Sequence, residues 1–381
     1  ERWVARAHRA ESALLFNSGF DANYGLLSSV PQPGDFVVFD ELCHNSMREG
    51  IRASRASSLA FEHSCIASLR AQLGAAREAI ATTQAQRQQQ MRQRQQWQQC
   101  VDPAPGPSSD GSGPSPGSPG EEEGSGGGDC GSSIFVAVES VYSMDGDLAP
   151  LKDIADTAHE FGASLIVDEA HGLGVVGPGG RGLVNALGLE THSSLFATVY
   201  TYGKALGAHG ACVCGPAVLR TYLVNYARPL VYSTALPLHS LVTIEEGYRH
   251  LKHEAQGLQQ RLARVVQAFK QSFNQSLDQS EQGLEQGPGA GVLLLPSDTA
   301  VQAVLVPGNA RVSAAAAALR ARGFAVLPIR APTVPAGGER LRICLHTHNT
   351  EKEAGQLARA IADVARRDPR NCARGAPVAK L

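Results

Sequence analysis

Apolar residues recur along the chain in two patterns, which together predict alternating strands and helices. Short apolar runs bounded by turn residues predict buried strands at 13–16, 36–39, 134–138, 164–167, 195–200 and 211–214. Helical periodicity predicts helices between them, including 66–81 and 148–161. Strands that are apolar on both faces and alternate with helices are typical of a mostly parallel sheet flanked by helices. We therefore expect functional groups beyond the carboxyl ends of these strands.

After residue 238 the pattern changes and predicts a smaller α/β unit. A long amphipathic helix over 241–270 precedes further predicted elements, which are strands at 303–306, 325–327 and 341–345 and helices at 314–322 and 351–366. We thus expect a large domain over 1–238 and a small C-terminal domain over 239–381.

A tract of low sequence complexity interrupts the predicted large domain. Residues 84–99 are mostly Gln and Arg, and residues 101–133 are almost entirely Pro, Gly, Ser and acidic residues. Such sequence cannot bury enough apolar surface to offset the entropy lost on folding. We therefore predict a disordered surface insertion over 82–133, in which the Gln/Arg part can extend the preceding helix by a few turns. A partner-binding tether is the alternative interpretation.

The composition argues against several classes of protein. The 381 residues include 34 basic and 36 acidic side chains, which is not the balance of a nucleic-acid-binding or membrane-surface protein. No stretch approaches the roughly 18 apolar residues that a membrane span needs. The eight cysteines lack zinc-site spacing, so we predict no metal site and expect reduced, intracellular thiols.

Polar segments follow three of the predicted strands at their carboxyl ends. Asp168 ends one strand, with His171 in the turn after it; Lys204 follows a second strand, and Ser143 a third. Taken singly, Asp168 is explained as a helix cap and Lys204 as a solvated loop residue. Together they fit a pyridine aldehyde cofactor, because a lysine can bind the aldehyde and a carboxylate can keep the ring nitrogen protonated. Thr201 and the backbone amides at the predicted helix start, Gly19-Phe20, can bind phosphate.

Five motifs in fixed order resemble those of the α-oxoamine synthases. They are Ser-Gly-Phe-Asp-Ala-Asn at 18–23, Asp-Glu-Leu-Cys-His-Asn-Ser at 40–46, Ser-Met-Asp-Gly-Asp at 143–147, Asp-Glu-Ala-His-Gly at 168–172 and Thr-Tyr-Gly-Lys at 201–204. The resemblance covers nearly the whole chain apart from the low-complexity tract. It implies an aspartate-aminotransferase-like α/β fold (fold type I) and pyridoxal 5'-phosphate bound as a Schiff base.

The resemblance also implies the catalytic residues. Lys204 would form the Schiff base and act as general base, and Asp168 would pair with the pyridinium nitrogen. His44 would stack on the cofactor ring, and His171 would hydrogen-bond its phenolic oxygen. The full set of cofactor-binding residues implied by the resemblance is Gly19, Phe20, His44, Ser143, Asp168, His171, Thr201, Lys204, Ser233 and Thr234.

Residues outside the cofactor site are assigned by the same resemblance. Ser233 and Thr234 match a segment that reaches the phosphate of a partner subunit, which implies a homodimer. Thr333 and Arg342 would face the substrate, with Arg342 as the carboxylate clamp. Without the resemblance, Arg342 is equally explained as a strand residue with its head group in solvent. Glu139 also matches a family position, with less weight.

The segments 329–337 and 340–342 most resemble one branch of the family. That branch joins L-alanine to an acyl-CoA thioester, pimeloyl-CoA (or pimeloyl carrier protein), in biotin synthesis. The alternatives within the family are glycine C-acetyltransferase, 5-aminolevulinate synthase and the catalytic subunit of serine palmitoyltransferase. A non-catalytic scaffold or regulatory subunit is the alternative from another class, although such subunits typically lose the lysine.

The two ends of the sequence add two expectations. Ala379-Lys380-Leu381 resembles the Ser-Lys-Leu type of peroxisomal address, so we expect a peroxisomal protein, with the cytoplasm as the alternative. Family members carry a segment ahead of the position that matches Glu1, and it contributes to the acyl-substrate site. We therefore expect the sequence to be a fragment of a longer protein.

Overall fold

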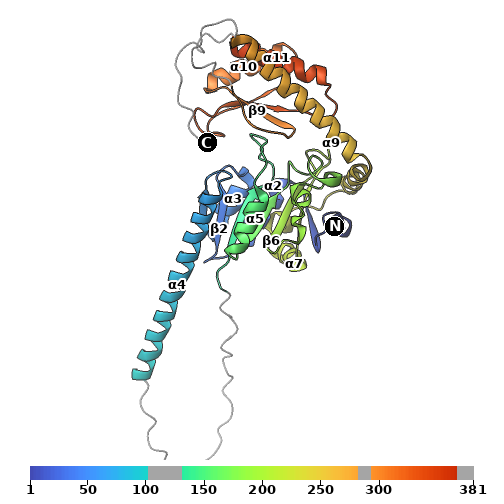
Figure 1. Cartoon of the computed structure of the whole chain (residues 1–381). Helices are drawn as coiled ribbons and strands as arrows, with labels where there is room; N and C mark the ends of the chain where they lie inside the picture. Colours follow the sequence, from blue (N-terminus) through green and yellow to red (C-terminus); the bar gives the residue numbers. More distant parts are fainter. Residues whose placement is uncertain (102–130, 282–292, 367–381) are drawn as a thin grey trace, which may run out of the picture.

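The structure is a computed structural model that describes residues 1–101, 131–281 and 293–366. Within these ranges, two β-sheets flanked by helices are connected along the chain by the long helix α9 (Leu238–Glu281) (Figure 1). The start of α9 at Leu238 is close to the predicted domain boundary, which itself stays a prediction. None of the helices in the described ranges contains an apolar stretch long enough to cross a bilayer.

Seven strands of the described residues form the larger sheet. In spatial order they are β1 (Ser12–Phe16), β7 (Ala211–Gly215), β6 (Leu195–Thr201), β5 (Ser164–Asp168), β4 (Ile134–Glu139), β2 (Phe36–Asp40) and β3 (Ser57–Phe61). The strands from β6 to β3 are parallel, whereas β7 is antiparallel to both of its neighbours. The six strands predicted for this sheet are confirmed. β3 was not predicted because it is an edge strand whose residues are mostly exposed.

Helices cover both faces of this sheet. One face carries α2 (Gly19–Ser29), α3 (Asn45–Ala53), α7 (Ala217–Tyr226) and α8 (Arg228–Val231). The other face carries α4 (Ile66–Val101), α5 (Leu151–Glu160) and α6 (Leu183–Ala186). Consecutive strand residues point to opposite faces, so Val37 packs against the first set of helices and Val38 against the second. Burial on both faces explains why the strands read as continuous apolar runs.

Helix α4 extends far beyond the sheet that it packs against (Figure 1). Leu69 and Leu73 near its start are fully buried, whereas every side chain over 81–97 is exposed. Gln, Arg and Ala favour the helix, and no Gly or Pro occurs over 75–102 to end it. The predicted extension of the preceding helix into the Gln/Arg part is therefore confirmed, and it reaches Val101, so the predicted disorder does not begin at residue 82. Residues 131–133 lead into β4 as irregular backbone, and the rest of the predicted insertion lies outside the described residues.

The smaller sheet lies beyond α9 in the sequence. Its described strands, in spatial order, are β10 (Leu327–Ile329), β11 (Arg340–Cys344), β9 (Val301–Leu305) and β8 (Leu293–Leu294), and each is antiparallel to its neighbours. The core between this sheet and its helices is formed with α9, α10 (Asn309–Ala321) and α11 (Glu351–Arg366). The predicted strands 303–306 and 341–345 and the helix 351–366 are confirmed. The strand predicted at 325–327 lies instead at Leu327–Ile329, β8 was not predicted, α10 starts earlier than predicted, and α9 is longer than predicted at both ends.

Candidate active site

The carboxyl ends of the parallel strands bring the predicted catalytic residues to one edge of the larger sheet. β4 ends at Glu139 and β5 at Asp168, and these two residues pair directly across the sheet. Lys204 follows the end of β6, the next strand along. Since adjacent strands lie about 4.8 Å apart, three ionisable groups meet here on neighbouring strands.

Asp168 is a buried carboxylate, with 3% of its surface exposed. Its Oδ1 accepts a hydrogen bond from the Ala170 amide (2.8 Å), and its Oδ2 accepts one from Asn23 Nδ2 (2.7 Å). Asn23 Nδ2 also donates to Ser46 Oγ (3.0 Å). These bonds compensate for burial and fix the orientation of the carboxylate. The sequence analysis gave Asn23 no role, although a polar residue between Ala22 and Leu26 on the buried face of a helix was a usable signal.

Lys204 is solvent-accessible but surrounded by the walls of a cleft. Loss of surrounding water lowers its pKa, and the positive charge of Arg342 adds to this; the negative charges of Asp168 and Glu139 oppose it. A lowered pKa increases the fraction of neutral amine at neutral pH. The neutral amine is the form that attacks a carbonyl or removes a proton.

Both predicted catalytic histidines are neutral in this environment. Burial and the positive charges of Lys204 and Arg342 lower the pKa of His171 to about 2. His44 caps the N-terminus of α3 through its Nδ1, which accepts from the Ser46 amide at 3.2 Å. Burial is the main cause that lowers the pKa of His44 as well. Each ring can therefore hydrogen-bond or stack without adding a charge.

Glu139 is more central than the sequence analysis indicated. Burial and the negative charge of Asp168 raise its pKa well above the usual range, so its carboxyl group is neutral. The backbone amides of His44 and Ser143 oppose this rise, and the Oε1 of Glu139 has no hydrogen-bond partner among the described residues. A buried carboxyl group thus lies beside the two loops that carry these residues.

The predicted phosphate-binding residues lie at the start of α2. The Ser18 hydroxyl caps this helix by accepting from the Asp21 amide (3.0 Å). A Cβ atom at Gly19 would lie 3.1 Å from Thr201 Oγ1, so the helix start and this hydroxyl are adjacent. Free amides at a helix N-terminus beside a hydroxyl form a favourable anion site. Phe20 is 45% exposed and points to the surface.

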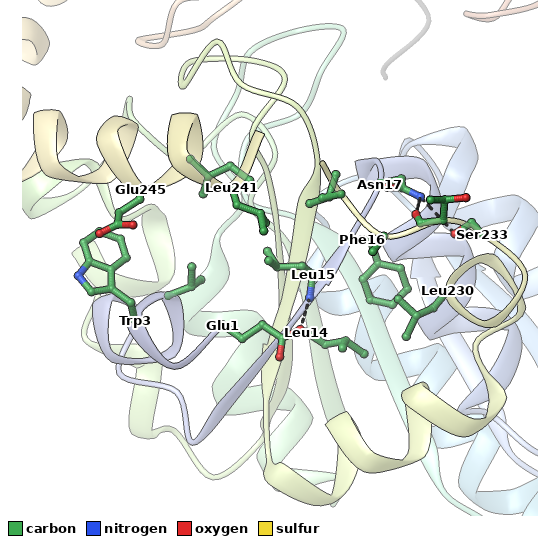
Figure 2. Close-up of a pocket in the computed structure, with 15 residues that line it drawn as sticks. Glu1, Trp3, Leu14, Leu15, Phe16, Asn17, Leu230, Ser233, Leu241 and Glu245 are labelled. Carbon is green, nitrogen blue, oxygen red and sulfur yellow. Dashed lines mark hydrogen bonds between the residues drawn. The ribbon is translucent and has the colours of Figure 1, made fainter. Parts of the chain in front are cut away.

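Ser233 and Thr234 are held near this helix start within the same chain. Asn17 Nδ2 donates to Ser233 Oγ (3.2 Å) and to the Thr234 carbonyl (2.9 Å). Both residues are exposed. They also line a cavity of about 560 Å³ that Figure 2 shows, whose other walls are mainly apolar and come from α1 (Arg2–Ala7), β1 and the start of α9. Because this cavity contains none of the catalytic groups described above, we do not place the reaction there.

A second cavity, of about 650 Å³, joins the two sheets. His171 and Lys204 line it from the larger sheet, and Arg342 lines it from β11 of the smaller sheet. The Nε of Arg342 is buried and has no hydrogen-bond partner among the described residues. It is therefore available to bind an anion. Thr333 is exposed in the loop between β10 and β11 and does not line this cavity.

These residues fit pyridoxal phosphate. Lys204 would supply the amine for its aldehyde, Asp168 the carboxylate for its ring nitrogen, and Gly19 with Thr201 the donors for its phosphate. The unpaired Nε of Arg342 leaves a separate place for a substrate carboxylate.

A family model described as aminotransferase class I and II matches residues 3–361. The chain belongs to this family. A curated 8-amino-7-oxononanoate synthase of Emericella nidulans is 37% identical to it over 368 residues, covering 95% of this chain and 76% of the relative. The resemblance to the α-oxoamine synthases is thereby confirmed.

Solved structures of class I and II relatives show the same fold. A serine palmitoyltransferase of S. paucimobilis with bound pyridoxal phosphate has a TM-score of 0.73 and 23% identity, covering 96% of this chain and 75% of the other. An 8-amino-7-oxononanoate synthase of Francisella tularensis has a TM-score of 0.67 and 22% identity, covering 96% and 86%. The predicted aspartate-aminotransferase-like fold is therefore confirmed.

His63 forms an ionic cluster next to the site and was given no role by the sequence analysis. Its Nδ1 lies 3.0 Å from Asp40 Oδ1, and its Nε2 lies 2.9 Å from Asp147 Oδ2. Burial alone would lower the pKa of His63, but hydrogen bonds to Asp147 and Asp40 raise it to about 10. The imidazolium therefore links the end of β2 to the loop that follows β4.

We expect this cluster to make stability depend on pH. Because the folded pKa of His63 is above its unfolded value of about 6.5, its contribution is complete below pH 6.5 and is lost as the pH rises through about 10. Between pH 7 and pH 10, the free energy of unfolding should fall by about 1–3 kcal/mol more in the wild type than in His63→Gln. Urea unfolding at several pH values measures this difference.

The control is His253→Gln, which changes an exposed histidine on α9. This variant should follow the wild-type pH curve. Parallel curves for the wild type and His63→Gln would contradict the assignment of a charged His63.

Proposed function

We propose that this chain is an 8-amino-7-oxononanoate synthase. In biotin synthesis, such an enzyme condenses L-alanine with pimeloyl-CoA (or pimeloyl carrier protein) and releases 8-amino-7-oxononanoate, CoA and CO2. The observation that carries the proposal is one cleft that holds Lys204, His171 and Arg342 around the buried Asp168. The names and identities of the curated relatives support this choice within the class I and II family.

Residues of the larger sheet would hold the cofactor ring in the form that accepts electrons. Pyridoxal phosphate, when bound, supplies an aldehyde that condenses with amines and a protonated ring that accepts electrons from a substrate carbanion. Asp168, oriented by Asn23, would hold the proton on the ring nitrogen. His171 would offer a hydrogen bond to the phenolic oxygen without introducing charge, and His44 would cover the ring.

Lys204 and Arg342 act on the amino acid from two sides of the cavity. Arg342 binds the alanine carboxylate through its unpaired guanidinium and so presents the Cα atom. The neutral amine of Lys204 removes the Cα proton. The new bond joins Cα to the thioester carbonyl carbon, and the bond to the CoA sulfur breaks so that CoA leaves as the thiolate. The carboxylate then leaves as CO2, and the protonated Lys204 returns a proton to Cα. Leu251, Leu258 and Leu262 supply an apolar wall suited to an acyl chain.

We also infer that the chain is a homodimer. The segment around Ser233 and Thr234 exposes several large apolar side chains, which are Val231 (46%), Tyr232 (80%), Leu238 (75%) and Val242 (50%). A contiguous apolar surface of this kind is typical of a protein interface. The proposal that Ser233 and Thr234 reach the cofactor phosphate of the partner rests on the family resemblance of this segment, since within one chain they lie beside the start of their own α2.

A peroxisomal location remains a separate proposal. It rests on Ala379-Lys380-Leu381, which lies outside the described residues. The tripeptide resembles a receptor-read address and carries no structural argument.

Purified protein loaded with pyridoxal phosphate should condense L-alanine with pimeloyl-CoA. The kcat of Lys204→Ala should be lower by at least about 10³-fold, because this variant lacks both the Schiff-base amine and the general base. Release of CoA and product formation by mass spectrometry measure this. Lys252→Ala, which changes an exposed lysine on α9, should retain wild-type activity.

A panel of amino acids and thioesters separates the proposed activity from its alternatives. L-alanine, glycine and L-serine are each combined with pimeloyl-CoA and with acetyl-, succinyl- and palmitoyl-CoA. A preference for glycine or serine with one of the other thioesters would replace the proposed substrates. Wild-type turnover by Lys204→Ala would overturn the mechanism itself.

The double variant Leu238→Glu/Val242→Glu should shift the protein from dimer to monomer, because four charged oxygens would be buried in the apolar interface. Sedimentation velocity at micromolar concentration measures this shift. Val218→Glu/Met91→Glu, at two exposed apolar positions away from Ser233, is the control and should leave the dimer intact. A monomeric wild type would contradict the proposal.

A fluorescent protein fused to the N-terminus should locate to peroxisomes in a eukaryotic host, and deletion of residues 379–381 should release it to the cytoplasm. An unchanged distribution after the deletion would count against the address.

A further inference from the structure

The loop between β4 and α5 is built as a tight hairpin. The Gly146 amide donates to the Tyr142 carbonyl (2.8 Å), and the Tyr142 amide donates to the Asp147 carbonyl (3.0 Å). A β-bridge between Val141 and Leu148 closes its base. In Figure 1 this loop rises from the larger sheet toward β9. It also carries Ser143, so it belongs to the wall of the cofactor site.

The tip of this hairpin is fixed to the smaller sheet. Asp145 forms an ion pair with Arg340 of β11, and only 3% of the Arg340 side chain is exposed. The Gly146 carbonyl accepts from Ser297 Oγ (2.9 Å) and from Thr299 Oγ1 (2.8 Å), which precede β9. Gly146 has a φ of +79°, and a Cβ atom there would lie 2.7 Å from Ser297 Oγ. Only glycine therefore permits so close an approach.

The base of the hairpin is fixed to the larger sheet. Asp147 binds the His63 imidazolium, which also binds Asp40 at the end of β2. The hairpin is thus held from both sides, and it connects two sheets whose residues must act on one substrate.

Strand β11 links the Asp145–Arg340 ion pair at the hairpin tip to Arg342, which lines the cavity. Residues two apart on a strand point to the same face, so Arg340 and Arg342 share the face of β11 that looks toward the larger sheet. Arg340 is anchored by Asp145, whereas Arg342 keeps a buried, unpaired Nε in the cavity. A shift of Arg340 therefore carries Arg342 with it.

We propose that Asp145 is a positioning residue, which acts through Arg340 to place the Arg342 guanidinium for the carboxylate of the amino-acid substrate. This inference rests on the proposed function, because it takes Arg342 as the carboxylate clamp. It assigns the hairpin a role in amino-acid affinity that is separate from its contribution to stability.

The test measures amino-acid binding without any acyl thioester. Cofactor-loaded protein is titrated with L-alanine, glycine or L-serine, whichever the wild type binds, and the absorbance change of the cofactor gives Kd. Asp145→Asn should raise Kd about tenfold, which corresponds to about 1.4 kcal/mol. The methyl ester of the same amino acid lacks the carboxylate, so its Kd should change less than about twofold.

A double-mutant cycle shows whether Asp145 acts through Arg342. Arg342→Ala should weaken binding by itself, and adding Asp145→Asn should then have little further effect. Additive losses would overturn the proposal.

Two further variants separate positioning from stability. Asp145→Asn/Arg340→Gln removes both buried charges, so its melting temperature should return toward that of the wild type while Kd stays raised. Glu339→Gln removes a carboxylate that accepts from the Gly308 and Gly337 amides within the smaller sheet, and it should lower the melting temperature without changing Kd. A lower melting temperature with unchanged Kd in Asp145→Asn would show a merely structural role.

A measurement on the cofactor-free protein gives an independent readout. Asp145→Asn should increase amide hydrogen exchange over 141–149 and 297–301, the two segments that meet at the hairpin tip, and leave 351–366 unchanged. Equal exchange in variant and wild type would contradict the inference that Asp145 fixes the hairpin tip to the smaller sheet. If the wild type binds no amino acid, the proposed function and this inference fail together; if it binds one but does not use pimeloyl-CoA, only the acyl substrate was wrong.

Discussion

A carboxylate buried at the end of a parallel strand must be compensated, and the centre of this protein is organised around that requirement. Asp168 is compensated by the Asn23 amide and by the backbone after β5. On the next strand, burial together with the negative charge of Asp168 raises the pKa of Glu139 well above its usual range. Lys204 faces the same two groups from the other neighbouring strand, where burial lowers its pKa and their negative charges oppose this. Burial at this edge of the sheet therefore shifts the pKa of each group, and the charge of Asp168 modifies the shifts of Glu139 and Lys204.

The site is divided between two sheets. The larger sheet supplies a fixed set of groups at its carboxyl edge, whereas the smaller sheet supplies Arg342. Chemistry that needs a proton acceptor on one side and a carboxylate clamp on the other depends on the relative position of these sheets. The hairpin between β4 and α5 and the helix α9 are the connections that the described residues provide.

Much of this arrangement could be predicted from the sequence. Buried parallel strands are recognised as apolar runs, and their carboxyl ends lie at one edge of the sheet. Asp168 and Lys204 were found in this way. Asn23 was not assigned, because its position on the buried face of a helix signals a buried polar role but does not identify Asp168, 145 residues away, as its partner. His63 was missed because its partners, Asp40 and Asp147, are 23 and 84 residues away. The helical extension over 82–101 was predicted as a few turns of the Gln/Arg part, but its full length was not, because low complexity was given more weight than helix propensity.

Helix α4 leaves the sheet in the direction opposite to the smaller sheet, and β4 starts from the amino edge (Figure 1). The chain between them therefore enters and leaves on the side away from the reacting groups. At this point the polypeptide can gain or lose length, or accept a reporter domain, without moving any atom that touches the substrate.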